Sequence, residues 1–200
     1  MTYIIGITGR IATGKSTISK ILISKGIPVI DCDKLGHELY NKDSIAFNEF
    51  VTTFGEQIIG EDGNINRRVL SKLIFDNPEN VQKISQISWP AIYQLLKQRI
   101  EEYKQQNIKI IGVEAALLIK ADWEIITSIW QTRVSDDIII KRLKERNNLS
   151  EEDARKRLSN QPSQEEYDQK ANVSFDTNKT LEETTMEITA EVDKLLSLIQ

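Results

Sequence analysis

The stretch Gly9-Arg10-Ile11-Ala12-Thr13-Gly14-Lys15-Ser16-Thr17 decides the fold of this chain. It fits the pattern of a phosphate-binding loop (P-loop), in which a glycine and four further residues precede Gly-Lys-Ser or Gly-Lys-Thr. The run 3–7 before it is apolar and rich in β-branched residues, which predicts a buried strand. After it, residues 16–25 place apolar side chains at helical spacing. The loop is therefore predicted to lie between a strand and the start of a helix, as the motif requires.

Each part of this loop suits a bound polyphosphate. Glycines allow a tight turn, and successive backbone N–H groups then form a nest for an anion. Lys15 brings a positive charge to the β- and γ-phosphates, and the Ser16 hydroxyl suits a Mg²⁺ ion. Arg10 and Ala12 stand where related loops often have glycine, and they are tolerated there only if their φ values are negative, because a side chain penalises positive φ. The predicted nucleotide-binding residues are Gly9, Ala12, Thr13, Gly14, Lys15, Ser16 and Thr17.

Composition excludes several classes of protein. The 200 residues suffice for one domain with insertions, and the net charge of -4 argues against broad nucleic-acid binding. The single cysteine, Cys32, excludes an internal disulfide and a cysteine-based zinc site. No apolar run approaches the roughly 20 residues that span a bilayer, and the N-terminus has no signal-peptide pattern. We expect a cytoplasmic protein without nucleic-acid or membrane partners.

Strand and helix patterns alternate along the chain. Residues from about 34 to 106 are predicted to be helical, with breaks at Gly55, 60–63, 77–78 and 89–90. Residues 181–199 carry one continuous apolar stripe, which we expect to pack on the sheet. Alternation of this kind predicts an α/β fold of three layers around a parallel sheet. Further strands are predicted at 27–31, 108–113, 127–132 and 172–176.

Acidic residues stand at the carboxyl ends of two predicted strands. Asp31 and Asp33 follow the second, and Glu114 closes the third. In open α/β sheets this edge binds the ligand, so these carboxylates should share an edge with the P-loop. Asp33 is our candidate for the base that accepts a proton from an alcohol acceptor, although it could instead cap the next helix. Asp31 is structural or in the Mg²⁺ shell, and Glu114 contacts a Mg²⁺-bound water or a lid residue.

A cationic segment follows the fourth strand. Ser135 begins a helix and Ser150 another, and residues 141–157 gather seven basic side chains. The segment is either a solvated helix face balanced by acids or a mobile lid. The P-loop favours the lid, because phosphoryl transfer needs positive charge around the migrating group.

The chain resembles the dephospho-coenzyme A kinase family over essentially its whole length. The resemblance is carried by residues 5–17, 26–38, 67–68, 114–118, 142–146 and 149–161, and by Asn178. It implies transfer of the γ-phosphate of ATP to the ribose 3′-hydroxyl of dephospho-coenzyme A, the last step of coenzyme A synthesis. It also implies a P-loop kinase fold with a core of 1–37, 107–140 and 170–200, a helical acceptor-binding insertion of 38–106 and a lid of 141–169.

The resemblance also implies roles for individual residues. The catalytic residues would be Asp33, Lys15, Arg142 and Arg146, and the nucleotide would also meet Arg146 and Asn178. The acceptor would meet Asp33, His37, Arg67, Glu114 and Leu117, and Mg²⁺ would meet Ser16 and Asp33. The chain departs from the family pattern at Trp89, where histidine is usual, at Ala116, where proline is common, and at Lys120, where glutamate is common.

Two alternatives remain open at this point. One is a kinase for nucleoside monophosphates or another small molecule. The other is a regulatory module that binds a nucleotide without turning over an acceptor. The sequence carries no indication of oligomeric state.

Overall fold

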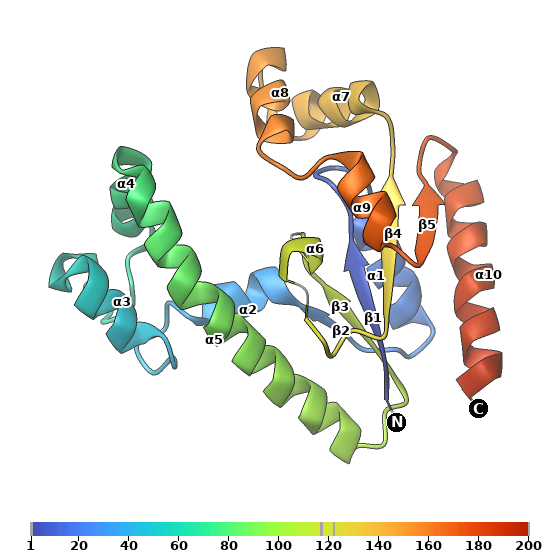
Figure 1. Cartoon of the computed structure of the whole chain (residues 1–200), viewed down its shortest axis with the longest axis horizontal. Coiled ribbons are helices and arrows are strands. Elements are labelled where there is room, and N and C mark those ends of the chain that lie inside the picture. The colour runs from blue at the N-terminus through green and yellow to red at the C-terminus, as the bar shows by residue number, and fades with distance from the viewer. Residues whose placement is uncertain (1, 117, 122, 200) are drawn as a thin grey trace. The chain divides into compact units, whose positions relative to one another are not determined.

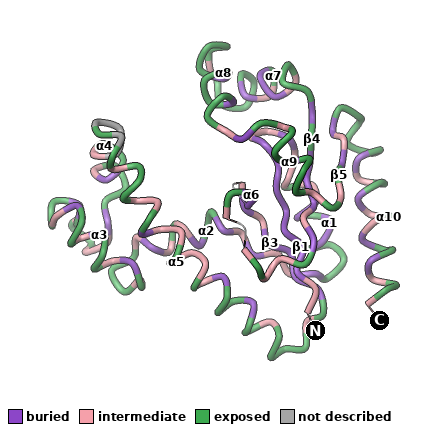
Figure 2. Tube along the Cα trace, in the orientation of Figure 1, coloured by how far each residue is buried: buried purple, intermediate pink, exposed green. Residues whose placement is uncertain are grey.

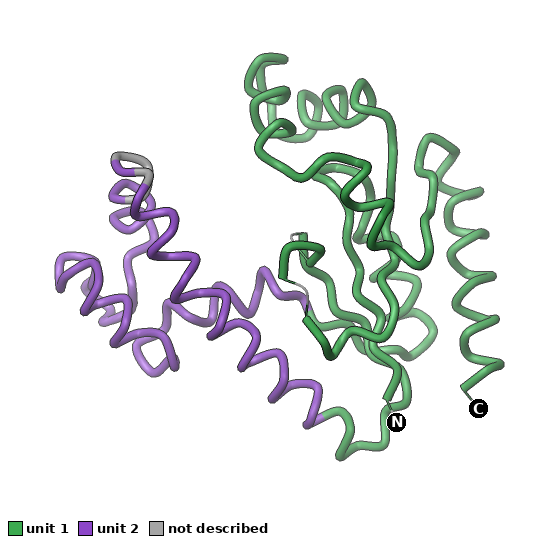
Figure 3. The backbone as a smooth tube through the Cα atoms, in the orientation of Figure 1, with its two compact units in different colours: residues 1–30, 103–200 green, residues 31–102 purple. Residues whose placement is uncertain are grey.

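A computed structural model of the chain describes residues 2–116, 118–121 and 123–199. It divides into two compact units (Figure 3). Unit 1 comprises Met1–Ile30 and Tyr103–Gln200, and unit 2 comprises Asp31–Glu102. The boundaries expected above for core, insertion and lid stay a prediction.

A five-stranded sheet organises unit 1 (Figure 1). Its order is β2 (Val29–Asp31), β3 (Ile110–Glu114), β1 (Tyr3–Thr8), β4 (Ser128–Arg133) and β5 (Val173–Asp176). The pairings of β1 with β3, of β1 with β4 and of β4 with β5 are parallel. Ile7 lies opposite both Glu114 and Trp130, so the carboxyl ends of three strands meet at the edge where the P-loop begins. The α/β fold with a parallel sheet is therefore confirmed.

The strands β1, β3 and β4 are mostly buried, whereas β5 buries only Phe175 (Figure 2). Ile5 and Ile7 of β1 are fully buried, and they pack with Ile188 and Val192 of α10 (Leu181–Ile199). The prediction that the closing helix packs on the sheet is thus confirmed. The other helices of unit 1 are α1 (Lys15–Ser24), α6 (Leu118–Ala121), α7 (Asp136–Asn147), α8 (Glu151–Ser159) and α9 (Gln164–Lys170).

Unit 2 is helical and has a core of its own. The core gathers Phe50, Phe54, Leu39 and Leu70, among other apolar side chains. The elements are α2 (Cys32–Glu38), α3 (Phe47–Phe54), the short 3₁₀-helix η1 (Glu56–Ile58), α4 (Arg67–Asp76) and α5 (Pro78–Gln105). None of the helices, as far as the chain is described, is both long and apolar enough to cross a bilayer.

Two sequence-based expectations about these elements were wrong. The expected break at 89–90 does not occur, because α5 continues through Pro90. Proline removes one helical hydrogen bond, but Ile87 and Ala91 on either side of it are buried in the core of unit 2 and hold the helix together. The second strand begins at Val29 rather than at residue 27. Pro28 has no N–H to donate, although its carbonyl still accepts from the N–H of Gly112 at 2.9 Å.

Candidate active site

The P-loop connects β1 to α1 through three residues of positive φ. Gly9 has a φ of 141° and Gly14 a φ of 101°. A Cβ at Gly9 would lie 2.6 Å from the carbonyl oxygen of Thr132, so only glycine fits there. The condition of a negative φ at Ala12 was wrong, because its φ is 59°. This left-handed conformation costs about 1–2 kcal/mol for a residue with a Cβ, and hydrogen bonds from neighbouring elements hold it.

The side chains of the loop bond back to the loop itself. The Lys15 ammonium donates to the carbonyls of Gly9 at 2.9 Å and Arg10 at 3.2 Å. The Thr13 hydroxyl donates to the Arg10 carbonyl at 2.8 Å and lies 2.8 Å from the hydroxyl of Thr132. These bonds keep the loop curled at the start of α1. No acid stands in the first turn of α1, so the positive end of its dipole is left for an anion.

Ser16 and Thr17 occupy that first turn. Ser16 is exposed and Thr17 is half-buried. An exposed hydroxyl at this place is a ligand of the oxygen type that Mg²⁺ prefers. Within the described residues, no three or more His, Cys, Asp or Glu side chains come together as a metal site.

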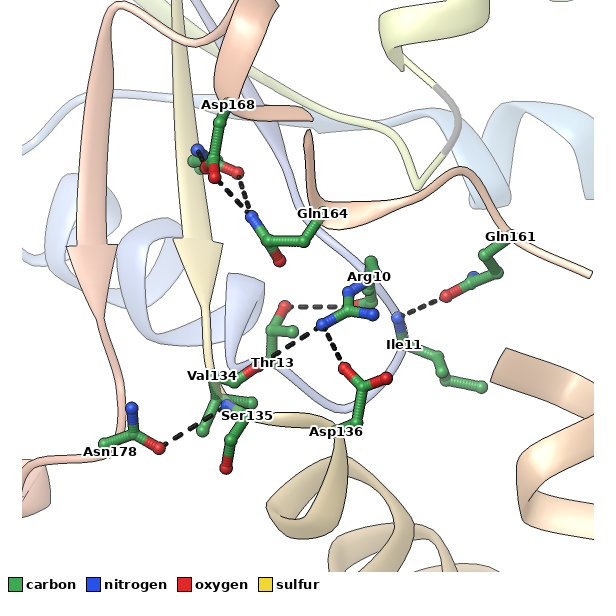
Figure 4. Close-up of polar contacts among 11 residues, drawn as sticks. Arg10, Ile11, Thr13, Val134, Ser135, Asp136, Gln161, Gln164, Asp168 and Asn178 are labelled. Carbon is green, nitrogen blue, oxygen red and sulfur yellow. Dashed lines mark hydrogen bonds and ion pairs between the residues drawn. The ribbon is translucent and has the colours of Figure 1, made fainter. Parts of the chain in front are cut away.

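Arg142 connects α7 to the P-loop. Its guanidinium donates to the carbonyl of Ala12 at 3.1 Å and to the carbonyl of Thr177 at 2.9 Å. The Thr177 hydroxyl donates to the carbonyl of Thr13 at 2.8 Å. Asn178, which follows, is exposed, and its side-chain oxygen accepts from the N–H of Ser135 at 3.5 Å (Figure 4). The fold thus brings Arg142 to the loop, whereas Asn178 contacts Ser135, the residue before α7.

Arg146 lies one turn after Arg142 on α7. It is exposed, and its Nε donates to the Asn147 side chain at 3.0 Å. None of the contacts given for Arg146 is with the P-loop. Arg146 does share one face of α7 with Arg142, because residues four apart lie on the same side of a helix.

Glu114 ends β3, as predicted, and its partner is a residue of α1. Its carboxylate accepts a hydrogen bond from the Ser19 hydroxyl at 2.5 Å. Two residues on, the carbonyl of Ala116 accepts from the hydroxyls of Thr8 at 3.4 Å and Tyr167 at 3.0 Å. Leu117, the remaining predicted acceptor contact in this stretch, lies outside the described residues.

In unit 2, Asp31 and Asp33 have different surroundings. Asp31 is the N-cap of α2, and its carboxylate accepts from the N–H groups of Asp33 at 3.0 Å and Lys34 at 3.3 Å. The alternative in which Asp33 caps this helix was therefore wrong. Asp33 is exposed in the first turn of α2.

His37, one turn after Asp33, meets Arg67 at the start of α4. Arg67 Nη2 lies 3.1 Å from His37 Nε2. The Arg67 guanidinium also lies over the ring of Tyr40, 5.7 Å from the ring centroid. Burial raises the pKa of Tyr40, and the charge of Arg67 partly offsets that rise. The structure thus gathers His37 and Arg67, two of the predicted acceptor residues, into one exposed cluster.

The sequence analysis did not identify Thr177 as a residue that supports the P-loop. It is only 6% exposed and joins Arg142 to Thr13. The available signal was its place just beyond the carboxyl end of β5, the same rule that singled out Asp33 after β2.

A parallel sheet with a P-loop after β1, and a cationic helix bonded to that loop, define a P-loop kinase. A sequence model of dephospho-CoA kinase matches residues 3–183. The chain belongs to the dephospho-CoA kinase family.

Individual relatives agree with this assignment. The dephospho-CoA kinase of Streptococcus mutans is 39% identical over 198 residues, which cover 98% of each chain. That of Dehalococcoides mccartyi is 33% identical over 181 residues, covering 90% of this chain and 91% of that protein.

Solved structures share the fold. TT1252 from Thermus thermophilus superposes with a TM-score of 0.78 at 29% identity, over 97% of this chain and 98% of that one. The dephospho-CoA kinase from Campylobacter jejuni gives a TM-score of 0.72 at 22% identity over 98% of both chains, a likeness of fold.

Proposed function

We propose that this chain transfers the γ-phosphate of ATP to the ribose 3′-hydroxyl of dephospho-coenzyme A, with the residues assigned below. The activity is that of its family: it is a kinase, and it phosphorylates dephospho-coenzyme A at the expense of ATP in coenzyme A synthesis. The choice of hydroxyl and the residue roles are our proposal. The observation that supports it most is the bonding of Arg142 to the P-loop carbonyl of Ala12.

The P-loop would hold the phosphates of ATP. Its backbone N–H groups and the start of α1 supply an anion nest, and Lys15 would exchange its bonds to loop carbonyls for bonds to phosphate oxygens. Ser16 would hold Mg²⁺, which neutralises charge on the phosphates when bound. Arg142 and Arg146 would add positive charge from α7, and Asn178 would lie on the nucleotide side.

Asp33 would act as the base for the acceptor hydroxyl. Its carboxylate is not used by the helix cap, because Asp31 fills that role. A ribose hydroxyl is far too weak an acid to ionise at neutral pH, so an aspartate that accepts its proton as the bond to phosphorus forms lowers the barrier. Arg67 and His37 would attract the anionic acceptor from the cluster that they form in unit 2.

A coupled assay of ADP release tests this function. We expect turnover with ATP, Mg²⁺ and dephospho-coenzyme A, with the new phosphate found on the 3′-oxygen by ³¹P NMR. Omitting the acceptor and offering nucleoside monophosphates are the controls. Turnover of the monophosphates alone would favour the small-molecule kinase, and nucleotide binding without any turnover would favour the regulatory module. The cytoplasmic location and the lack of a nucleic-acid partner stay predictions.

A further inference from the structure

Arg10, inside the P-loop, carries a buried charge. The residue is 6% exposed, and its Nη2 lies 2.7 Å from Oδ1 of Asp136 and 3.4 Å from the carbonyl of Val134 (Figure 4). Asp136 is the first residue of α7, the helix that brings Arg142 to the loop. A buried guanidinium is strongly disfavoured without a partner, so this pair ties the loop to the start of α7.

A second bond connects the next loop residue to the far end of the same segment. The N–H of Ile11 donates to the side-chain oxygen of Gln161 at 2.7 Å, between α8 and α9 (Figure 4). Arg10 and Ile11 of the P-loop therefore bond to Asp136, at the start of α7, and to Gln161, just after the end of α8. The loop and this helix pair cannot shift against each other without breaking one of these bonds.

We infer that Arg10 is a positioning residue for nucleotide binding, which acts through Asp136. The ion pair fixes the loop against α7, so that the backbone N–H groups and Arg142 share one arrangement before the nucleotide arrives. Binding to a preformed site avoids the loss of entropy from ordering the loop. The inference rests on the proposed use of ATP at this loop.

Nη2 of Arg10 makes both hydrogen bonds, one to the Asp136 carboxylate and one to the Val134 carbonyl. A lysine ammonium can provide one such donor and the same charge, so Arg10→Lys should keep much of the effect. Lysine also fills much of the same space, so Asp136→Asn, which removes the charge of the partner at nearly constant size, distinguishes the ion pair from packing. Asp137 provides a matched control, because it is exposed in the same first turn of α7 and carries the same charge.

The test is a double-mutant cycle on the full chain. Arg10→Ala, Arg10→Lys, Asp136→Asn, Asp137→Asn and the double variant Arg10→Ala/Asp136→Asn are compared. For each variant, ADP affinity is measured by calorimetry without acceptor. KM for ATP, KM for dephospho-coenzyme A and the melting temperature are then measured as well. Because the calorimetry needs no turnover, it remains informative even if the proposed acceptor is wrong.

We expect Arg10→Ala and Asp136→Asn each to weaken ADP binding and raise KM for ATP by about tenfold. The double variant should be no worse than either single one, while Arg10→Lys stays within about threefold of the wild type. Asp137→Asn should match the wild type, and KM for the acceptor should not move in any variant. Additive effects in the double variant, or a lower melting temperature with unchanged ADP affinity, would overturn the inference.

Discussion

The carboxylate of Asp31 accepts a hydrogen bond from the backbone N–H of Asp33 at 3.0 Å. Asp31 and Asp33 therefore have different roles. One completes the N-terminus of α2 by satisfying N–H groups that have no partner within the helix. The other keeps an exposed carboxylate that can meet an acceptor. This division allows chemistry and stability to be tested with separate variants.

Replacing Asp33 should affect turnover and not stability. Asp33→Asn keeps the size of the side chain but cannot accept a proton, so we expect a loss of about 10²–10⁴-fold in single-turnover rate. Its melting temperature should match the wild type. Asp31→Ala should do the opposite: it loses the cap and about 1 kcal/mol of stability, with a smaller effect on the chemical step. Near wild-type turnover by Asp33→Asn would move the search for the base to Asp31.

Two neighbouring arginines provide the next comparison. Arg67 contacts His37 and Tyr40, whereas Arg68 is exposed beside it. Arg67→Ala should raise KM for dephospho-coenzyme A by about tenfold, the cost of losing one charge-assisted hydrogen bond, and leave KM for ATP unchanged. Arg68→Ala is the control for the loss of charge. Equal effects of the two substitutions would mean that only the overall charge of this surface matters.

Local patterns predicted much of the fold correctly. The P-loop between β1 and α1, and the stripe of α10, follow from apolar spacing that each segment carries by itself. The carboxyl-end rule selected Glu114 and Asp33 without any structure, whereas Asn178 came from the family resemblance. These are features for which a short stretch of sequence decides the conformation.

The errors arose where distant residues decide the outcome. Ala12 takes a positive φ although its own Cβ disfavours it, and the hydrogen bond that meets its carbonyl comes from Arg142. The choice between Asp31 and Asp33 as helix cap depended on where α2 begins, a boundary that residue type does not determine. Pro90 could be judged only with the packing of α5 in view.

Lys15 should be essential for turnover and dispensable for folding. Its ammonium donates to the loop carbonyls of Gly9 and Arg10, and phosphate oxygens would replace these acceptors. Lys15→Ala should lower kcat by at least about 10²-fold, the scale seen when one donor to a developing anion is removed. Lys20 is an exposed lysine on the same helix, so Lys20→Ala serves as the control and should leave kcat unchanged. Turnover by Lys15→Ala at the wild-type rate would exclude the phosphate role.

The two arginines of α7 should differ in their effect on the free protein. Arg142→Ala removes the bonds to Ala12 and Thr177, so hydrogen exchange in the P-loop should rise even without nucleotide. Arg146→Ala should leave the free protein unchanged but reduce turnover and abolish nucleotide-induced protection of residues 141–157. The wild type with and without a nonhydrolysable ATP analogue is the reference. Equal exchange of 141–157 in both states of the wild type would argue against a lid.

Tyr167 of α9 should reveal its burial in alkaline solution. The residue is fully buried and its hydroxyl donates to the Ala116 carbonyl at 3.0 Å. Burial raises the pKa of its phenol from 10.0 to about 12; the charge of Arg10 opposes this rise and that of Glu166 adds to it. The folded state therefore holds this proton at pH values where the unfolded chain has lost it. The stabilisation from the protonated phenol is complete below pH 10 and disappears as the pH approaches 12.

We expect the free energy of unfolding of the wild type to fall more steeply between pH 10 and 12 than that of Tyr167→Phe. Allowing for solvent screening, the extra loss should be about 1–2 kcal/mol. At neutral pH, Tyr167→Phe should be less stable by about 1 kcal/mol, because the hydrogen bond to Ala116 is lost. Urea unfolding at each pH measures both quantities, and Tyr103→Phe, on a half-buried tyrosine of α5, controls for the general loss of a phenol. Parallel pH profiles for the wild type and Tyr167→Phe would mean that the phenol is not held protonated by the fold.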